Sequence, residues 1–407
     1  KRPRDPLSRA VAPVDEWTFV FLVPCLNEGA VLRNTLRAIR DLPWRRVWVW
    51  VIDDASDDDT LAIVREVAGT DRRVRWIHRR SPHARRGKGD ALNAAYRRVD
   101  RIATRFGANP ASVILTVLDA DGRPAPNLLA EAAAAFADGR VGAAQACVRI
   151  ANREGILPLL QDVEFAAAVA AIQNARAFFG SVGLGGNGQF TRLSALRTLG
   201  PTPWTRCLLE DFDLGVRLLL EGWHIRFLPG AHVAQQGLVS VRRFIRQRCR
   251  WAQGNLQCLR HVRPILASRL GAAAKLDLLY FLAQPWLNAL GSIVQAGAWG
   301  VLAGTLWRLP QARIGPGAGS PALAVISWLM LTLLPGIAWA MRYSRLPGEG
   351  RTRRLWRVVL AIPLYNLLTI PSVWWALARH LRGRGQWSKT ERLTERHAGM
   401  DVCGEGG

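Results

Sequence analysis

Four short apolar runs, the first three each followed by residues at helical spacing, constrain the fold more than any other feature of this sequence. They are Thr18 to Val23, Val47 to Ile52, Val74 to His78 and Ala111 to Leu118. Runs of this kind predict buried strands, and strands that alternate with helices predict parallel pairing. We therefore expect an α/β fold with a doubly wound, Rossmann-like sheet.

Two carboxylates stand one residue apart where the fourth run ends. Asp119 and Asp121 follow Leu118 and precede a Gly-Arg-Pro turn. In such sheets ligands bind outside the carboxyl ends of the strands. Two carboxylates with no basic residue between them repel each other unless a cation lies beside them. A hard divalent ion that carries phosphates meets this need, so the pair predicts a site for a metal-bound diphosphate.

Acidic residues also follow the second run. Asp53 and Asp54 lie at the strand end, and the acidic and hydroxyl-rich stretch 55–60 leads into the next predicted helix. Helix capping is an alternative that accounts for this stretch but not for Asp53 and Asp54. Carboxylates at a strand end can accept hydrogen bonds from a nucleobase or a ribose hydroxyl, so the pair predicts a nucleoside contact.

A glycine-flanked lysine, Lys88, follows the third run in a basic loop, before a helix expected from Ala91. Glycine lets the backbone approach a ligand closely, and a helix N-terminus favours anions. The loop therefore predicts a diphosphate contact, although it lacks the spacing of a Walker A loop. A solvated basic loop is the alternative.

Glu210 and Asp211 follow an apolar pair at the start of a predicted amphipathic helix, and Asp213 comes next. Acids in a first helical turn are ordinary partners of the helix dipole. Three acids directly after an apolar pair exceed that need, and a carboxylate in this place can deprotonate a hydroxyl group.

Gln247, Arg250 and Trp251 share one side of a further predicted helix, because they are spaced i, i+3 and i+4. An amide and a guanidinium can bind phosphate, and an indole ring offers a flat apolar face on which sugar rings stack. The triplet predicts a phosphate clamp beside a sugar site.

The chain carries 55 lysine and arginine residues against 31 acidic ones, a formal net charge of +24. This excess predicts a polyanionic partner: nucleic acid, anionic lipid or a phosphorylated substrate. No nucleic-acid fold motif is present and much of the basic charge flanks apolar segments, which favours anionic lipid and leaves no nucleic-acid partner. The six cysteines show no metal-ligand spacing and are expected to be reduced thiols.

Two uncharged runs, Leu278 to Trp307 and Ile314 to Met341, each exceed the about 20 residues that span a bilayer. A core helix is the alternative interpretation. A third uncharged run, Val358 to Ala378, is interrupted by two prolines. Arginine-rich segments follow the second and third runs, and the positive-inside rule makes both cytoplasmic.

Three simple crossings cannot satisfy that orientation, so we expect two spans, about 278–307 and 319–341, and a Pro-broken interfacial or re-entrant segment, 355–379. The expected organisation is a basic leader (1–15), a catalytic domain (16–262), a membrane domain (263–380) and a cytoplasmic tail (381–407).

In their order and spacing these blocks resemble family-2 glycosyltransferases with the GT-A fold, of the membrane-integrated kind that includes cellulose, chitin, hyaluronan and poly-N-acetylglucosamine synthases. The blocks that carry the resemblance are Pro24–Glu28, Asp53–Asp54, Gly87–Asp90, Asp119–Asp121, Glu210–Asp211 and Gln247–Trp251.

The resemblance implies a role for each block. It assigns nucleotide-sugar binding to Pro24, Asn27, Glu28, Asp53, Asp54, Lys88, Asp90, Asp119, Gln247, Arg250 and Trp251. It assigns a divalent metal, Mg²⁺ or Mn²⁺, to Asp119 and Asp121, and catalysis to Asp211 as general base with Glu210 beside it. A tail motif resembles a gating loop and implies nucleotide contacts by Trp387, Lys389, Thr390 and Arg392.

The implied activity is inverting transfer of a sugar from a nucleotide-sugar, expected to be a UDP-sugar, to a polysaccharide at the plasma membrane. Transfer of one sugar to a lipid such as diacylglycerol or a sphingoid is the alternative. A non-catalytic membrane scaffold or a nucleic-acid binder is the alternative from another class. Two departures matter: Leu209 stands where many members have threonine, and the segment 180–192 is richer in glycine than in cellulose synthases. The first leaves the base in place, and the second disfavours a glucan product.

Overall fold

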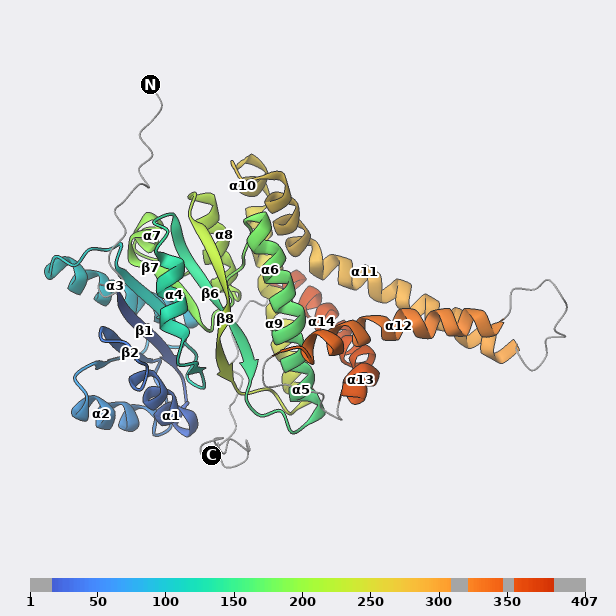
Figure 1. Ribbon diagram of the computed structural model, residues 1–407, viewed down its shortest axis with the longest axis horizontal. Coiled ribbons are helices and arrows are strands. Elements are labelled where there is room, and N and C mark those ends of the chain that lie inside the picture. Colours follow the sequence, from blue (N-terminus) through green and yellow to red (C-terminus); the bar gives the residue numbers. More distant parts are fainter. Residues whose placement is uncertain (1–16, 309–320, 347–354, 384–407) are drawn as a thin grey trace, which may run out of the picture.

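The structure of the protein, a computed structural model, describes residues 17–308, 321–346 and 355–383 (Figure 1). An α/β domain is followed by helices that extend away from it. The predicted leader and the predicted gating-loop residues, Trp387, Lys389, Thr390 and Arg392, lie outside the described residues.

One mixed sheet forms the centre of the α/β domain, with the strand order β3-β2-β1-β4-β7-β6-β8-β5. The strands are β1 (Thr18–Cys25), β2 (Val47–Asp53), β3 (Val74–His78), β4 (Val113–Val117), β5 (Arg123–Pro124), β6 (Val141–Ile150), β7 (Gln189–Arg192) and β8 (His224–Gln235). The four predicted strands are β1 to β4, and they pair in parallel. Strand β7 pairs antiparallel with β4, so the sheet is not parallel throughout.

Helices cover both faces of the sheet. They are α1 (Gly29–Arg40), α2 (Thr60–Thr70), α3 (Lys88–Arg105), α4 (Leu128–Phe136), α7 (Leu193–Thr198), α8 (Glu210–Leu220) and α9 (Val241–Gln257). Alternate residues of β1 point to opposite faces: Phe21 packs in one core with α1, α2 and α4, and Leu22 packs in a second core with α3, α7 and α8. Burial on both faces explains why these strands are continuously apolar.

A long helix packs against strands β6 and β8 of the α/β domain. It consists of α5 (Ile156–Val163), a π-helical segment η2 (Glu164–Val169) and α6 (Ala170–Phe179). Its apolar side chains share a core with α12 (Pro321–Tyr343) and α13 (Leu355–Leu367). This helix therefore joins the sheet domain to the C-terminal helices.

The C-terminal part begins with a short 3₁₀ segment, η3 (Cys258–His261), and α10 (Val262–Ala267). The long helix α11 (Ala272–Arg308) follows, then α12, α13 and α14 (Thr369–Leu381), and α11 and α12 project from the domain (Figure 1). These helices expose large apolar side chains, among them Leu290, Ile293, Val294, Val301, Trp307, Leu334, Trp356 and Leu364. Exposed apolar surface of this extent marks a site of membrane or protein contact.

Two helices among the described residues are long and apolar enough to cross a membrane, Ile156–Phe179 and Leu355–Leu381. The first is largely buried within the protein and carries Asp162 and Glu164, which suits a core helix better than a span. The second contains the predicted Pro-broken segment. Membrane association is supported, whereas a multi-pass topology is not supported by these two helices and stays a prediction.

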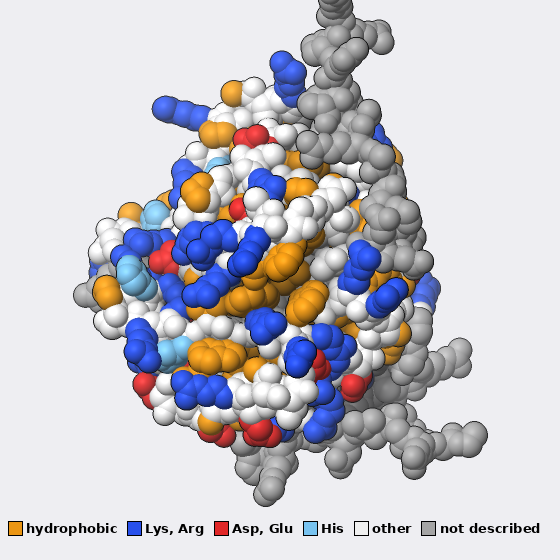
Figure 2. Space-filling model, turned by 90° about the vertical axis from the view of Figure 1, so that its left-hand side faces the viewer, with side chains coloured by type: hydrophobic (Ala, Val, Ile, Leu, Met, Phe, Trp, Pro, Cys, Tyr) orange, Lys and Arg blue, Asp and Glu red, His pale blue; other side chains and the backbone are white. Residues whose placement is uncertain are grey.

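The face of the α/β domain turned away from the projecting helices is strongly basic. Lys and Arg side chains there gather around a central apolar area (Figure 2). The positive charge expected from the composition is thus displayed on the described surface as well as near the apolar helices. The five cysteines among the described residues are free thiols, as expected.

Candidate functional site

An open cleft lies at the carboxyl ends of β1, β2 and β4, where sequence reasoning expects the ligand. Ten of the predicted site residues line it: Pro24, Glu28, Asp54, Lys88, Asp119, Glu210, Asp211, Gln247, Arg250 and Trp251. Val148, Phe165, Gly185, Gly186, Asn187 and Gln235 complete much of its wall. Segments far apart in the chain therefore meet in one place.

Lys88 lies among the acids of the cleft, at the first residue of α3, slightly earlier than the helix start expected near Ala91. Its Nζ donates to Asp119 Oδ1 (2.7 Å) and to the Gly186 carbonyl (3.1 Å), and lies 3.9 Å from Glu210 Oε1. Burial alone would lower the pKa of Lys88, but Asp119 and Glu210 raise it above its ordinary value. Lys88 therefore stays protonated and supplies a fixed positive charge.

The acid pair, Glu210 and Asp211, opens helix α8 and faces Lys88 across the cleft. Burial, and then the charge of Asp211, raises the pKa of Glu210 to about 7. Burial also raises the pKa of Asp211, whose Oδ1 accepts a hydrogen bond from the Phe212 N–H (2.7 Å). Carboxyl groups with raised pKa values are better proton acceptors once ionised, which suits general-base chemistry.

Gly186 shows what the glycine-rich segment allows. Its backbone has φ +69°, and a Cβ atom added there would lie 2.7 Å from Asp211 Oδ2 and 3.4 Å from Lys88 Nζ. Only glycine adopts this conformation readily and leaves that space open. The glycine-rich segment therefore approaches the Asp211 carboxylate closely.

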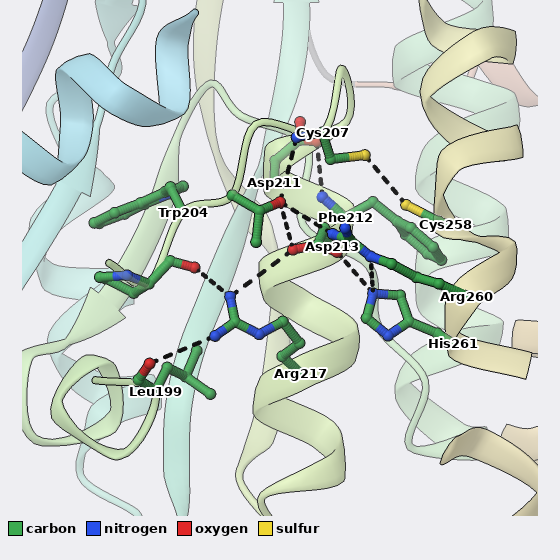
Figure 3. A network of polar contacts seen from close by, with 12 residues as sticks. Leu199, Trp204, Cys207, Asp211, Phe212, Asp213, Arg217, Cys258, Arg260 and His261 are labelled. Carbon is green, nitrogen blue, oxygen red and sulfur yellow. Dashed lines mark hydrogen bonds and ion pairs between the residues drawn. The ribbon is translucent and has the colours of Figure 1, made fainter. Parts of the chain in front are cut away.

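Asp213 has a different environment from the acid pair, although it lies in the same turn of α8 (Figure 3). It is fully buried, and its carboxylate bonds to His261 Nε2 (2.7 Å), Thr205 Oγ1 (2.9 Å) and the Arg260 guanidinium. Burial would raise the pKa of Asp213, but His261 and Arg260 hold it below its ordinary value. Asp213 thus ties α8 to η3, a role that sequence reasoning missed.

The clamp, Gln247, Arg250 and Trp251, lines the cleft from helix α9. The helix approaches the segment before α8 backbone to backbone, since a Cβ atom added to Gly254 would lie 2.6 Å from the Leu209 nitrogen. Gln257 Oε1 also accepts a hydrogen bond from the Leu208 N–H (2.8 Å). These contacts set the clamp directly beside the acid pair.

Four predicted site residues do not line the cleft. Asp53 is fully buried and bonds to His78 Nδ1 (2.6 Å). Asn27 Oδ1 accepts a hydrogen bond from the Asp57 N–H (2.7 Å), and Asp90 lies 3.5 Å from Arg206. Asp121 is buried, and its Oδ2 accepts a hydrogen bond from the Gln236 N–H (3.0 Å). These contacts support the loops around the cleft, and the ligand-binding roles of the four stay predictions.

The chemistry of the acids fits a divalent ion, with one condition. Asp119 and Asp121 offer hard carboxylate oxygens, and the contact of Asp119 with an ammonium group shows that its position favours positive charge. The described residues contain no group of three or more His, Cys, Asp or Glu side chains that could hold a metal ion. An ion at these aspartates would therefore need further oxygens, such as those of a bound diphosphate.

Sequence reasoning missed residues that shape the cleft from behind. Gln145 binds the glycine-rich segment at both Gly185 (2.8 Å) and the Asn187 carbonyl (2.7 Å), and Asn187 Oδ1 accepts a hydrogen bond from the Asp119 N–H (3.1 Å). Arg79 is buried and bonds to Asp54. The basic run after β3 could have indicated Arg79, whereas a glutamine within a strand carries no such signal.

Comparison with known proteins gives consistent results. A family model described as "Glycosyltransferase like family 2" matches residues 17–254. A beta-monoglucosyldiacylglycerol synthase of Trichormus variabilis is 33% identical over 278 residues, which cover 67% of this chain and 56% of the relative. A poly-beta-1,6-N-acetyl-D-glucosamine synthase of Staphylococcus aureus is 27% identical over 252 residues, which cover 60% and 57%.

A solved structure has a similar fold. It is the mannosyltransferase PcManGT from Pyrobaculum calidifontis in complex with GDP-Man and Mn²⁺, with a TM-score of 0.57 and 23% identity, covering 94% of this chain and 92% of that one. This likeness confirms the expected GT-A architecture. The chain spans little more than half the length of the two curated relatives.

Proposed function

This chain belongs to glycosyltransferase family 2, and we propose that it transfers one sugar from a nucleotide-sugar to a hydroxyl group of a membrane lipid, with inversion at the anomeric carbon. The observation that carries the proposal is the meeting of Lys88, the acid pair and the clamp in one cleft beside exposed apolar helices.

The donor would lie across the carboxyl ends of the strands. Asp54, which is held by Arg79, lines the cleft near the end of β2 and suits a nucleoside contact. Lys88 and Arg250 supply positive charge for the diphosphate, and a UDP-sugar is our preferred donor. A divalent ion held by Asp119 and Asp121, Mg²⁺ or Mn²⁺, would stabilise negative charge on the diphosphate leaving group.

Asp211 is the proposed general base. It removes the proton from the acceptor hydroxyl, whose oxygen attacks the anomeric carbon while the bond to the diphosphate breaks. Lys88 and Arg250 stabilise the charge that develops on the leaving group. Trp251 offers its ring as an apolar stacking surface at the acceptor end of the cleft, and the negative charge of Asp211 raises the pKa of the neighbouring Glu210.

A lipid acceptor has two observations in its favour. The end of the cleft beside Phe165 and Trp251 lies next to the long helix on which α12 and α13 pack, so an acceptor at a membrane surface would be within reach. The relative with 33% identity is named for glucose transfer to diacylglycerol. A polysaccharide acceptor is the second candidate, and the likeness to the poly-N-acetylglucosamine synthase favours it.

The apolar helices and the basic segments beside them suit an anionic membrane surface. We place the catalytic domain on the cytoplasmic side of the plasma membrane, where nucleotide-sugars are made. Two spans within α11 and α12, with α13 and α14 at the interface, are the topology we propose.

Product analysis tests the acceptor. The protein in vesicles that contain dioleoylglycerol would be given radiolabelled UDP-glucose, UDP-N-acetylglucosamine, UDP-galactose or GDP-mannose with Mg²⁺ or Mn²⁺. The expected product is a single organic-soluble glycolipid. Polymer that stays at the chromatogram origin would support the second candidate, and absence of any transferred sugar with every donor would overturn both.

A further inference from the structure

We infer that Arg248, together with Glu164 and Tyr365, positions Trp251 of the clamp and links its orientation to the docking of helix α13. The inference rests on the proposed function of the cleft. Arg248 lies inside the clamp sequence but does not line the cleft, and its side chain points instead to the long helix and to α13.

The contacts of Arg248 are geometrically specific. Its two terminal nitrogens donate to the two carboxylate oxygens of Glu164 at 2.7 and 2.6 Å, a bidentate pair. One of these nitrogens also donates to the Tyr365 hydroxyl (3.2 Å), and that hydroxyl donates to Glu164. Only 13% of the Arg248 side chain and 25% of Glu164 are exposed, so solvent weakens the pair less than a surface pair.

The same guanidinium group stacks on aromatic rings. Its central carbon lies 4.5 Å from the ring centre of Trp251 and 4.7 Å from that of Phe244. Trp251 also meets Phe165 edge-on, with ring centres 6.4 Å apart, and both rings line the cleft. Trp251 therefore contacts both the guanidinium group that Glu164 holds and the ring of Phe165.

The π-helical segment supplies a second, independent observation. Glu164 and Phe165 are the first two residues of η2, and both hold this cluster. A π segment inside a helix changes the direction of the side chains at that point, and such segments are common at functional sites. Here it directs one residue to Arg248 and the next to Trp251.

Arg248, Glu164 and Tyr365 thus connect Trp251, at the acceptor end of the cleft, to helix α13. The outer face of α13 is apolar and exposed. If α13 is not seated, Tyr365 is withdrawn from Glu164 and Arg248, and Trp251 loses part of its support. Arg248 is a positioning residue: it acts through Trp251 and leaves the donor subsite around Lys88 unchanged.

Tyr365→Phe tests this link, because it removes one hydroxyl and leaves the ring. The chain provides a matched control in Tyr343→Phe, since Tyr343 of α12 makes the same kind of bond to a buried acid of the long helix, Asp162 (2.6 Å), without touching the clamp. Both variants would be purified as the full chain and assayed in vesicles with and without dioleoylglycerol.

We expect Tyr365→Phe to raise the KM for dioleoylglycerol about fivefold, the size of one typical net hydrogen-bond contribution, with nucleotide release to water unchanged. Tyr343→Phe should leave both unchanged. Arg248→Lys, which keeps the charge but not the bidentate geometry, should raise the KM about tenfold. Equal effects of the two tyrosine variants, or none in either, would overturn the inference.

Hydrogen exchange gives a readout that does not depend on activity. The backbone amides of the peptide that contains Trp251 should exchange faster in Tyr365→Phe than in wild type and in Tyr343→Phe. If the wild type transfers no sugar, the proposed function fails while this measurement still tests the link. Unchanged exchange in Tyr365→Phe would overturn the link alone.

Discussion

The acid pair and Asp213 lie in the same turn of α8, and burial acts on all three carboxyl groups, yet their pKa values shift in opposite directions. Asp213 has His261, Arg260 and Thr205 as close partners, and its charged form is stabilised. Glu210 and Asp211 share the more distant charge of Lys88 and repel each other.

The difference shows how one short acidic sequence serves two purposes. Partners brought from η3 make Asp213 a structural link, whereas too few partners leave the acid pair ready to take up a proton. Buried carboxyl groups whose charged form is poorly stabilised lower the stability of the fold, and groups with such raised pKa values are candidates for a catalytic role.

The largest effect is expected from Asp211→Asn, which removes the proposed base. Transfer should fall by about 10²- to 10⁴-fold, the usual range for loss of a general base, with no loss of thermal stability. Nucleotide release and melting temperature would be measured together. Glu221→Gln, at the exposed end of the same helix, is the control and should be neutral. Full activity of Asp211→Asn would remove the catalytic assignment.

Asp213→Ala should show the reverse pattern. Loss of a buried charge partner should lower the free energy of unfolding by about 3 kcal/mol, because the His261 and Arg260 side chains lose their acceptor. The kcat of the molecules that stay folded should change less than about twofold, because Asp213 does not line the cleft. Denaturant unfolding and active-site titration separate the two quantities. A large loss of kcat with unchanged stability would contradict the contrast.

Gly186→Ala should reduce activity by a smaller factor, because it acts on the position of the acid pair. The left-handed backbone costs about 1–2 kcal/mol for a residue with a Cβ atom, and the added methyl group would displace the Asp211 carboxylate. We expect kcat/KM to fall about tenfold. Gly183→Ala is the matched control, because its added Cβ atom meets nothing closer than 3.5 Å and no left-handed φ is involved. Equal losses in both would show that the effect is not local to Asp211.

The smallest effect is a shift of the pH profile. The base must be ionised, and the pKa values of both acids are raised, that of Glu210 to about 7, so kcat/KM should fall as the pH decreases below neutrality. Glu210→Gln removes the carboxyl group of the pair whose pKa lies near 7, raised by burial and by the charge of Asp211, and should therefore move this acid limb to lower pH. Asp213 has a lowered pKa and should not contribute. An acid limb that stays in place in Glu210→Gln would contradict the coupling.

Much of the fold and of the cleft could be predicted because the signals are local. The apolar runs that form β1 to β4 bring Asp54 and Asp119 to one edge of the sheet whatever the rest of the chain does. Helical spacing likewise places Gln247, Arg250 and Trp251 on one side of α9.

What could not be predicted depends on packing between distant segments. Asp53 and Asp54 are neighbours in sequence, but the alternation of a strand end turns one to His78 and the other to the cleft. Asp213 depends on Arg260 and His261, nearly fifty residues later in the chain. The π segment at Glu164 has no sequence signal, because it reflects tertiary contacts rather than the preferences of its residues.

The backbone contact at Gly254 has a consequence for how enzymes of this design could be diversified. Gly254 of α9 lies directly against the backbone at Leu209, just before the acid pair. This close contact fixes the distance between the clamp and the proposed base. Substitutions elsewhere cannot easily lengthen it. We therefore expect new acceptors to be accommodated by changes in the neighbouring walls, at Val148 and Phe165, while the distance from the proposed base to the clamp stays the same.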